Sequence, residues 1–146
     1  MHKYLECKNA NEEGVRQLIL SGVNVNQRCN EGNTPLQLYA MRYRLIDKKI
    51  VTALIEAGTN INNLNTTGYS VFLTIMNNEY LSQSDFEICQ MLIEADAEVN
   101  IAVNKTHAFS SLIKFNCASE DWIKLLIKAG FSIIHLGRME LQKITE

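Results

Sequence analysis

The chain has few of the residues that form catalytic or metal centres. Its 146 residues include three histidines and four cysteines. The cysteines are far apart, with no Cys-x-x-Cys pair: Cys7, Cys29, Cys89 and Cys117. Neither a zinc site nor a redox motif is predicted, and we expect no metal and no cofactor. The seven glycines stand singly, so a glycine-rich phosphate-binding loop is also missing.

Charge and hydropathy argue against two further classes of partner. The net charge is −2, and lysines and arginines are spread along the chain, so the basic stripe of a nucleic-acid binder is missing. No apolar run approaches the roughly 20 residues of a membrane span. Residues 1–6 lack the apolar core of a secretory signal. We therefore expect a cytoplasmic protein with reduced, mostly buried thiols.

One pattern recurs along the chain: an apolar helical run, a turn residue, then an aliphatic residue and asparagine. It occupies residues 18–26, 54–62 and 92–100, so the closing asparagines are 36 and 38 residues apart. A recurrence in this range indicates a stacked helical repeat. Because 47% of the residues are hydrophobic and 21% charged, we expect one folded domain over residues 1–146.

The second unit shows the pattern most clearly. Thr34 precedes Pro35, which predicts a helix with Thr34 as its N-cap and Pro35 at the first position. Asp47 should cap a second helix, with a buried apolar stripe in residues 50–55. Gly58 should end that helix, because a residue in the left-handed conformation favours glycine.

The third unit repeats these signals with substitutions. Ser70 takes the place of the capping threonine, and Ser84 and Glu87 predict a capping box for the second helix. Asp96 stands where the other units have glycine, which should cost about 1 kcal/mol.

The outer units are less regular. In the first, residues 4–7 should form a short helix, and Asn11 should cap a second. In the fourth, residues 111–113 and 122–130 give two helices, with Ser119 as a cap. We expect units at residues 1–29, 30–65, 66–103 and 104–134, with a C-terminal helical cap at 135–146. The fold class is thus all-α, a solenoid of about four helix-turn-helix repeats with short hairpin loops.

These motifs resemble ankyrin repeats. Residues 32–36 and 54–62 closely follow the family's patterns G-x-T-P-L and L-L-x-x-G-A-D-V-N. Gln37 stands where the family usually has His and Asp96 where it has Gly, and we expect both to weaken single units. The units are similar to those of poxvirus host-range ankyrin proteins and of stand-alone bacterial ankyrin proteins.

The resemblance implies a non-catalytic adaptor or inhibitor, of host-range or immunity type, that is monomeric when unbound and lies in the cytoplasm, or in the host cell cytoplasm if viral. Ankyrin proteins typically bind partner proteins through the concave face, formed by the hairpin tips and the exposed side of each first helix. By register we expect contacts from Arg28, Asn30, Glu31, Asn33, Met41, Arg42, Leu64, Thr66, Thr67, Tyr69, Asn77 and Asn78, and with looser register from Val103, Lys105 and His107. Tyr69, Met41 and Arg42 are the preferred anchors, because aromatic residues and arginine dominate interface energetics.

The sequence gives little support for a catalytic or ligand-binding role of individual side chains. The acidic pairs Glu12–Glu13 and Glu120–Asp121 fall in first turns of helices, where they complement the helix dipole. Trp122 lies in an apolar helical stripe, which favours core packing. Cys117 and His107 are the one cysteine–histidine pair within a single unit. We predict no catalytic residue.

Two alternatives remain open. The repeats could be the N-terminal stack of a larger assembly that self-associates through the C-terminal end. The resemblance also implies a modification, because residues 92–100 match the Leu-x5-Asp/Glu-Val/Ile-Asn pattern of asparagine hydroxylation in animal cells. Hydroxylation of Asn100 would add about 16 Da, roughly one oxygen atom.

Overall fold

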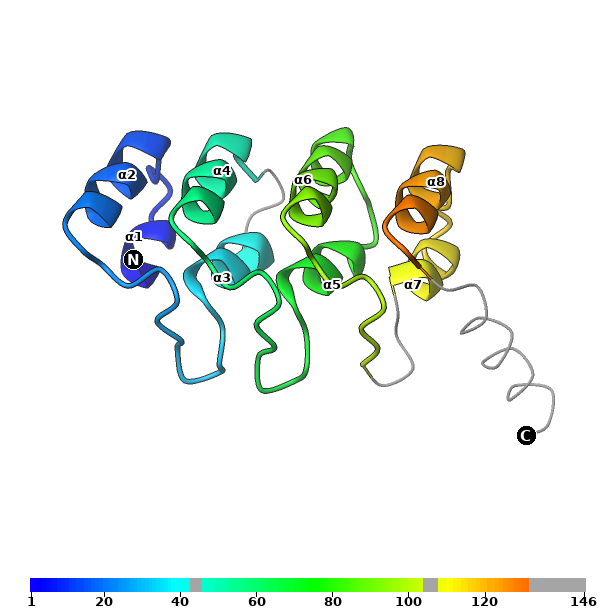
Figure 1. The fold of residues 1–146 in the computed structure, drawn as a ribbon, viewed down its shortest axis with the longest axis horizontal. Coiled ribbons are helices and arrows are strands. Elements are labelled where there is room, and N and C mark those ends of the chain that lie inside the picture. The colour runs from blue at the N-terminus through cyan, green and yellow to red at the C-terminus, as the bar shows by residue number, and fades with distance from the viewer. Residues whose placement is uncertain (43–45, 104–107, 132–146) are drawn as a thin grey trace.

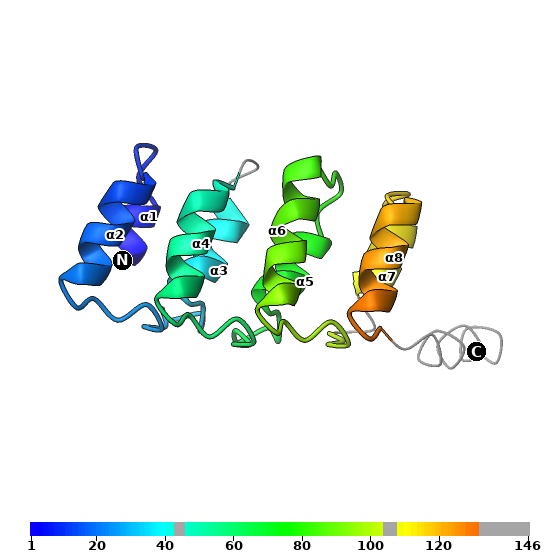
Figure 2. The same cartoon turned by 45° about the horizontal axis from the view of Figure 1, so that its top comes forward.

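The computed structural model describes residues 1–42, 46–103 and 108–131, which form eight α-helices in two rows (Figure 1). They are α1 (His2–Leu5), α2 (Glu12–Leu20), α3 (Pro35–Arg42), α4 (Lys48–Glu56), α5 (Val71–Met76), α6 (Gln83–Glu94), α7 (Ala108–Lys114) and α8 (Glu120–Lys128). Odd-numbered helices form one row and even-numbered helices the other, and the helix pairs follow one another along the chain (Figure 2). The predicted all-α repeat architecture is confirmed. The proposed cap at 135–146 lies outside the described residues.

Most of the predicted helix starts are confirmed. A side-chain oxygen accepts a backbone N–H of the first turn at Asn11, Asp47, Ser70 and Ser119. Helix α3 begins at Pro35, and the Gln37 backbone N–H donates to Thr34 Oγ1 at 3.4 Å. Local capping chemistry therefore sets where these helices begin. The first helix lies two residues earlier than predicted, because α1 spans His2–Leu5 and leaves Cys7 outside it.

The capping box of α6 was predicted two residues too late. Its N-cap is Ser82, whose hydroxyl accepts from the Asp85 backbone N–H while the Asp85 carboxylate accepts from the Ser82 backbone N–H at 2.7 Å. Glu87 instead forms an ion pair with Lys48 of the preceding unit. Two serine–acid pairs overlap in this stretch, and the earlier one, Ser82 with Asp85, forms the box.

The predicted helix ends adopt the left-handed conformation. Gly58 has φ +82° and Asp96 has φ +65°. Gly22 and Gly130 hold the same place in the first and fourth units, also at positive φ. An aspartate in this region carries a conformational cost that glycine does not.

An asparagine ladder joins consecutive units along one edge. Asn26 donates from Nδ2 to the Gly58 carbonyl at 2.9 Å, and Asn62 donates in the same way to the Asp96 carbonyl at 2.9 Å. Asn100 continues the series to the Gly130 carbonyl at 3.2 Å. Each recurring asparagine thus ties its own unit to the left-handed helix end of the next, which explains why the motif closes on asparagine.

The hydrophobic core is continuous through the units, and Cys89 is the one cysteine buried in it. Leu54, Leu92 and Leu126 are fully buried at equivalent positions of their units. Cys89 is buried, and this burial, with a smaller contribution from the negative charge of Asp85, raises the pKa of its thiol. Cys7 is exposed, whereas Cys29 and Cys117 are half-buried, so the expectation of mostly buried thiols was wrong.

Candidate functional site

Two hairpin loops project from the row of first helices, one between α2 and α3 and one between α4 and α5 (Figure 1). Each tip is a tight turn in which a glycine N–H donates to a carbonyl three residues earlier: Gly32 to Cys29 and Gly68 to Asn65, both at 2.9 Å. Gly32 has φ +76°, and a Cβ there would lie 3.1 Å from the Thr66 backbone nitrogen. The close approach of the second hairpin therefore depends on glycine at this position.

The two tips are bonded directly to each other. Thr66 donates from both its backbone N–H and its hydroxyl to the Glu31 carbonyl, at 2.9 and 3.0 Å. Lower in the hairpins, Asn65 Nδ2 donates to Asn33 Oδ1 at 2.9 Å. These contacts join residues more than 30 positions apart, so the tips form one ledge across the second and third units.

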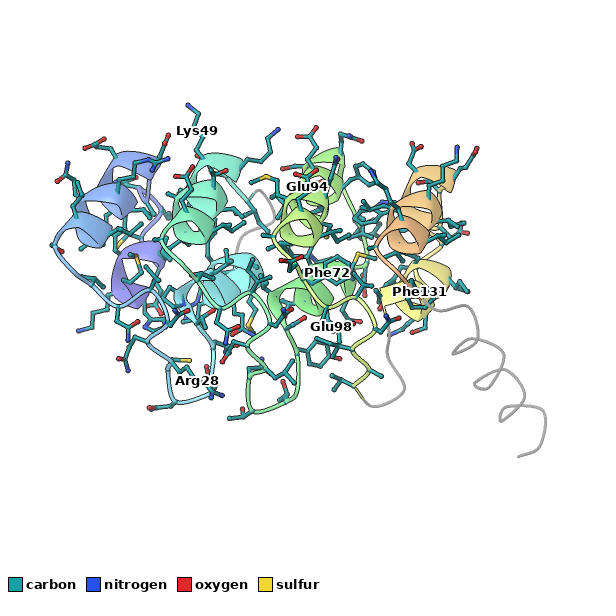
Figure 3. All side chains as sticks on the ribbon, viewed as in Figure 1. Arg28, Lys49, Phe72, Glu94, Glu98 and Phe131 are labelled. Atoms are coloured by element: carbon teal, nitrogen blue, oxygen red, sulfur yellow. The ribbon has the colours of Figure 1, made fainter. Side chains whose placement is uncertain are left out.

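Arg28 strengthens this ledge. It lies on the first hairpin, at the edge opposite Lys49 and Glu94 on the second helices (Figure 3). Its Nε donates to the Gly32 carbonyl and its Nη2 to the Leu64 carbonyl, both at 3.0 Å. The guanidinium thus supports the backbone of both hairpins, and its planar fork suits such paired contacts.

Gln37 connects α3 to the second hairpin from within the core. Its Nε2 donates to the carbonyls of Asn63 and Tyr69, at 3.0 and 2.9 Å, and its Oε1 accepts from Asn63 Nδ2 at 2.6 Å. The same Oε1 accepts the Thr34 backbone N–H at 2.9 Å. We expected Gln37 to weaken its unit, but its amide makes four hydrogen bonds, because it offers both donors and acceptors in a buried position.

The first helices add a row of exposed positions to the ledge. Met41, Asn77 and Ile113 are 36 residues apart, each at or just past the last turn of its helix. The Met41 side chain is 53% exposed and that of Ile113 is 54% exposed. Asn77 is half-buried as the C-cap of α5. Beside Met41, Arg42 forms an ion pair with Glu6 at 3.2 Å.

Most of the predicted contact residues are accessible. Those exposed are Arg28, Asn30, Glu31, Met41, Arg42, Leu64, Thr66, Thr67 and Asn78, and those half-buried are Tyr69, Asn77 and Val103. Lys105 and His107 lie outside the described residues. The structure brings the hairpin members together on the ledge and places Met41, Arg42, Asn77 and Asn78 on the helix row.

Asn33 does not lie on the surface. It is 1% exposed, with its Oδ1 accepting from Asn65 and its carbonyl 3.3 Å from His2 Nε2. Register places it at the hairpin edge, but the neighbouring hairpin covers it, so it is a structural residue and leaves the candidate surface. Ile113 was missed, although its 36-residue spacing from Asn77 could have identified it.

The residues considered for chemistry have structural partners. Glu12 forms an ion pair with Arg16 at 2.9 Å, and Trp122 is buried edge-to-face against Phe86, with ring centroids 5.0 Å apart. Cys117 Sγ lies 3.6 Å from the Glu79 carbonyl oxygen, and its suggested partner His107 is outside the described residues. Within residues 1–42, 46–103 and 108–131, no three His, Cys, Asp or Glu side chains gather as a metal site would require.

Two further expectations can be placed in the structure. The Asn100 side chain is half-buried and donates the last hydrogen bond of the asparagine ladder, to the Gly130 carbonyl. Its hydroxylation stays a prediction. Among the described helices, none is both long and apolar enough to cross a membrane.

Comparison with known proteins agrees with this architecture. Residues 4–103 match the profile of the family described as ankyrin repeats (3 copies). No curated protein matches the chain significantly. Ankyrin repeats are generally protein–protein interaction modules and are typically non-catalytic. Three matched repeats over more than half of the chain, together with the stacked helix pairs, show that the chain belongs to the ankyrin-repeat family.

Proposed function

We propose that this protein is an adaptor or inhibitor that binds one partner protein through its concave face and performs no catalysis of its own. The mechanism is occlusion or recruitment of that partner, in the cytoplasm, by a monomer. The observation that carries the proposal is the bonded ledge: the tips of two hairpins are held together by Thr66, Arg28 and Asn65, so their exposed side chains stand on a fixed backbone.

A fixed backbone favours binding for an energetic reason. Ordering a loop and its side chains on binding costs free energy, about 0.5–1.5 kcal/mol for each immobilised long side chain. Here the contacts between Arg28 and the Leu64 carbonyl, and between Thr66 and Glu31, order the hairpin backbone during folding, before a partner binds. Exposed residues around them, such as Thr67 and Asn30, then meet a partner without further rearrangement of the tips.

The test is affinity capture from the native source with tagged protein. The variant carries Tyr69→Ala and Arg42→Glu on the concave face, and a matched control carries Leu20→Ala and Lys49→Glu on the second helices, where both side chains are exposed. We expect a partner retained by wild type and control and lost by the concave-face variant. Equal retention by all three proteins would place binding on another surface.

A second candidate function is self-association through the C-terminal end of the stack. Ile127 is 50% exposed there, whereas Ile55 and Ile93, at the same position of inner units, are half-buried. Light scattering over a concentration series tests this candidate. A concentration-dependent dimer that is lost with Ile127→Glu, or on deletion of residues 137–146, supports it, and a monomer at all concentrations excludes it.

A further inference from the structure

The centre of the concave face carries almost no formal charge. Residues 57–84, which include the second hairpin and α5, contain one charged side chain, Glu79, although 21% of the whole chain is charged. Apart from Glu79, the accessible side chains of this stretch are amides, hydroxyls and single apolar groups, among them Leu64, Thr67 and Asn78. A charged partner segment would lose its hydration here and find no opposite charge in return.

Three basic groups near this region already have partners, while the Glu31 carboxylate, on the first hairpin tip, lies 3.7 Å from Cys29 Sγ. Arg42 pairs with Glu6 at 3.2 Å, and the Arg28 guanidinium donates to two backbone carbonyls. In the fourth unit, the Lys114 Nζ lies 4.7 Å from the centroid of the Phe115 ring. The side chains of Arg42, Arg28 and Lys114 are therefore less available to form ion pairs with a charged ligand.

Two apolar side chains flank the uncharged centre, at equivalent positions of the units on either side of it. Met41 and Ile113 are each more than half exposed, and Asn77 lies between them in the sequence register. Neighbouring packed helices are about 8–10 Å apart, so two steps along the stack separate the two anchors by roughly 20 Å. Large exposed apolar side chains at regular spacing are the kind of anchor that a partner's own apolar side chains cover.

We propose that the concave face recognises an uncharged protein segment with two apolar side chains, one packed on Met41 and one on Ile113. Between them the segment hydrogen-bonds to the amides of Asn77 and Asn78. This inference rests on the proposed function and specifies the chemistry of its partner. A separation of roughly 20 Å corresponds to about six residues of an extended strand or about thirteen residues of a helix.

The probe is a phage-displayed library of random peptides, each about 16 residues long, which covers both conformations. Selection uses the full-length wild-type protein. We expect enriched peptides without net charge that carry apolar residues at one of the two spacings. Their affinity should change less than about two-fold between low and high salt, because screening acts on charges and not on apolar contacts.

A matched pair of variants locates the site. Met41→Glu with Ile113→Glu should lower peptide affinity at least ten-fold, whereas Leu20→Glu, the same chemical change on a second helix, should leave it unchanged. All three positions are more than half exposed, so both variants should fold, and Trp122 fluorescence together with thermal unfolding verifies this. Equal affinity for both variants would overturn the anchor assignment.

The remaining outcomes separate this inference from the proposed function. Enriched peptides that are acidic or basic, and bind in a salt-sensitive way, would overturn the partner chemistry. If their binding were still lost with Tyr69→Ala and Arg42→Glu, the concave face would stand as the binding surface. A library without any enriched peptide would overturn recognition of a linear segment, while affinity capture would still test binding of a folded partner.

Discussion

Replacing Gln37 tests whether the hairpin ledge is held from within the core. Gln37→Ala removes an amide that donates to the carbonyls of Asn63 and Tyr69 and accepts from Thr34 and Asn63. The side chain is almost fully buried, so water cannot readily replace the lost partners. The substitution leaves two carbonyls and two N–H groups to find other partners, and it opens a cavity in the second unit.

The expected loss of stability follows from these four contacts. A hydrogen bond within a protein contributes about 0.5–1.5 kcal/mol net. Because Asn63 takes part in two of them, we expect a combined loss of about 2–4 kcal/mol for Gln37→Ala. In a chain of this size that corresponds to a fall of roughly 6–12 °C in the thermal midpoint.

Two further substitutions separate hydrogen bonding from packing. Gln37→Leu keeps most of the volume and removes every hydrogen bond, so it should destabilise nearly as much as Gln37→Ala. Gln37→His restores the residue most common in the family, with one donor and one acceptor in its neutral ring, and should lose about half as much. This order of the three variants would show that the polar contacts, and not the cavity, dominate.

The assay is urea unfolding followed by two probes in the same samples. Far-ultraviolet circular dichroism reports all helices, and fluorescence of the single tryptophan, Trp122, reports the fourth unit. If the stack unfolds as one unit, both midpoints should shift together when Gln37 is replaced. A stability within about 0.5 kcal/mol of wild type for Gln37→Ala would refute the reasoning, because that is the range of ordinary surface changes.

Three other predictions test the stack. Leu92→Ala, at a fully buried position, should cost about 2–5 kcal/mol, and an unchanged thermal midpoint would contradict its place in the core. Asp96 and Gly58 both have positive φ, a conformation that favours glycine. Asp96→Gly should therefore stabilise the protein by about 1 kcal/mol, and Gly58→Ala should destabilise it by a similar amount. Denaturant midpoints that move in the opposite direction would refute this. A Cβ on Gly14 would lie 1.7 Å from Tyr4 Oη, so Gly14→Ala should destabilise the wild-type protein. In a Tyr4→Ala background the clash is absent, and Gly14→Ala should stabilise the protein by roughly 1 kcal/mol because alanine favours a helix more than glycine does. A double-mutant cycle measures this difference.

Much of the fold could be predicted because its signals are local and recur. A capping side chain acts on a backbone N–H two or three residues away, so Asn11, Asp47 and Ser70 reveal helix starts without knowledge of the tertiary structure. The prediction for α6 was wrong where two local signals overlapped. Both Ser82 with Asp85 and Ser84 with Glu87 have the spacing of a capping box, and the local pattern does not say which pair forms it.

The binding surface was less predictable, because sequence register identifies equivalent positions but not what covers them. Asn33 and Tyr69 are equivalent positions on successive hairpins, yet Asn33 is buried by the Asn65 amide, whereas Tyr69 is half-buried. The amide that covers Asn33 comes from the next unit in the stack, which sequence register does not reveal. Ile113 shows the converse, since the 36-residue register alone places it in the same row as Met41 and Asn77. A residue on this face is therefore a candidate for recognition only when its register position is at least partly exposed and its polar side-chain atoms do not already support the neighbouring hairpin. Thr67 and Met41 meet the exposure condition, whereas Arg28, although exposed, is bound to the backbone of two units.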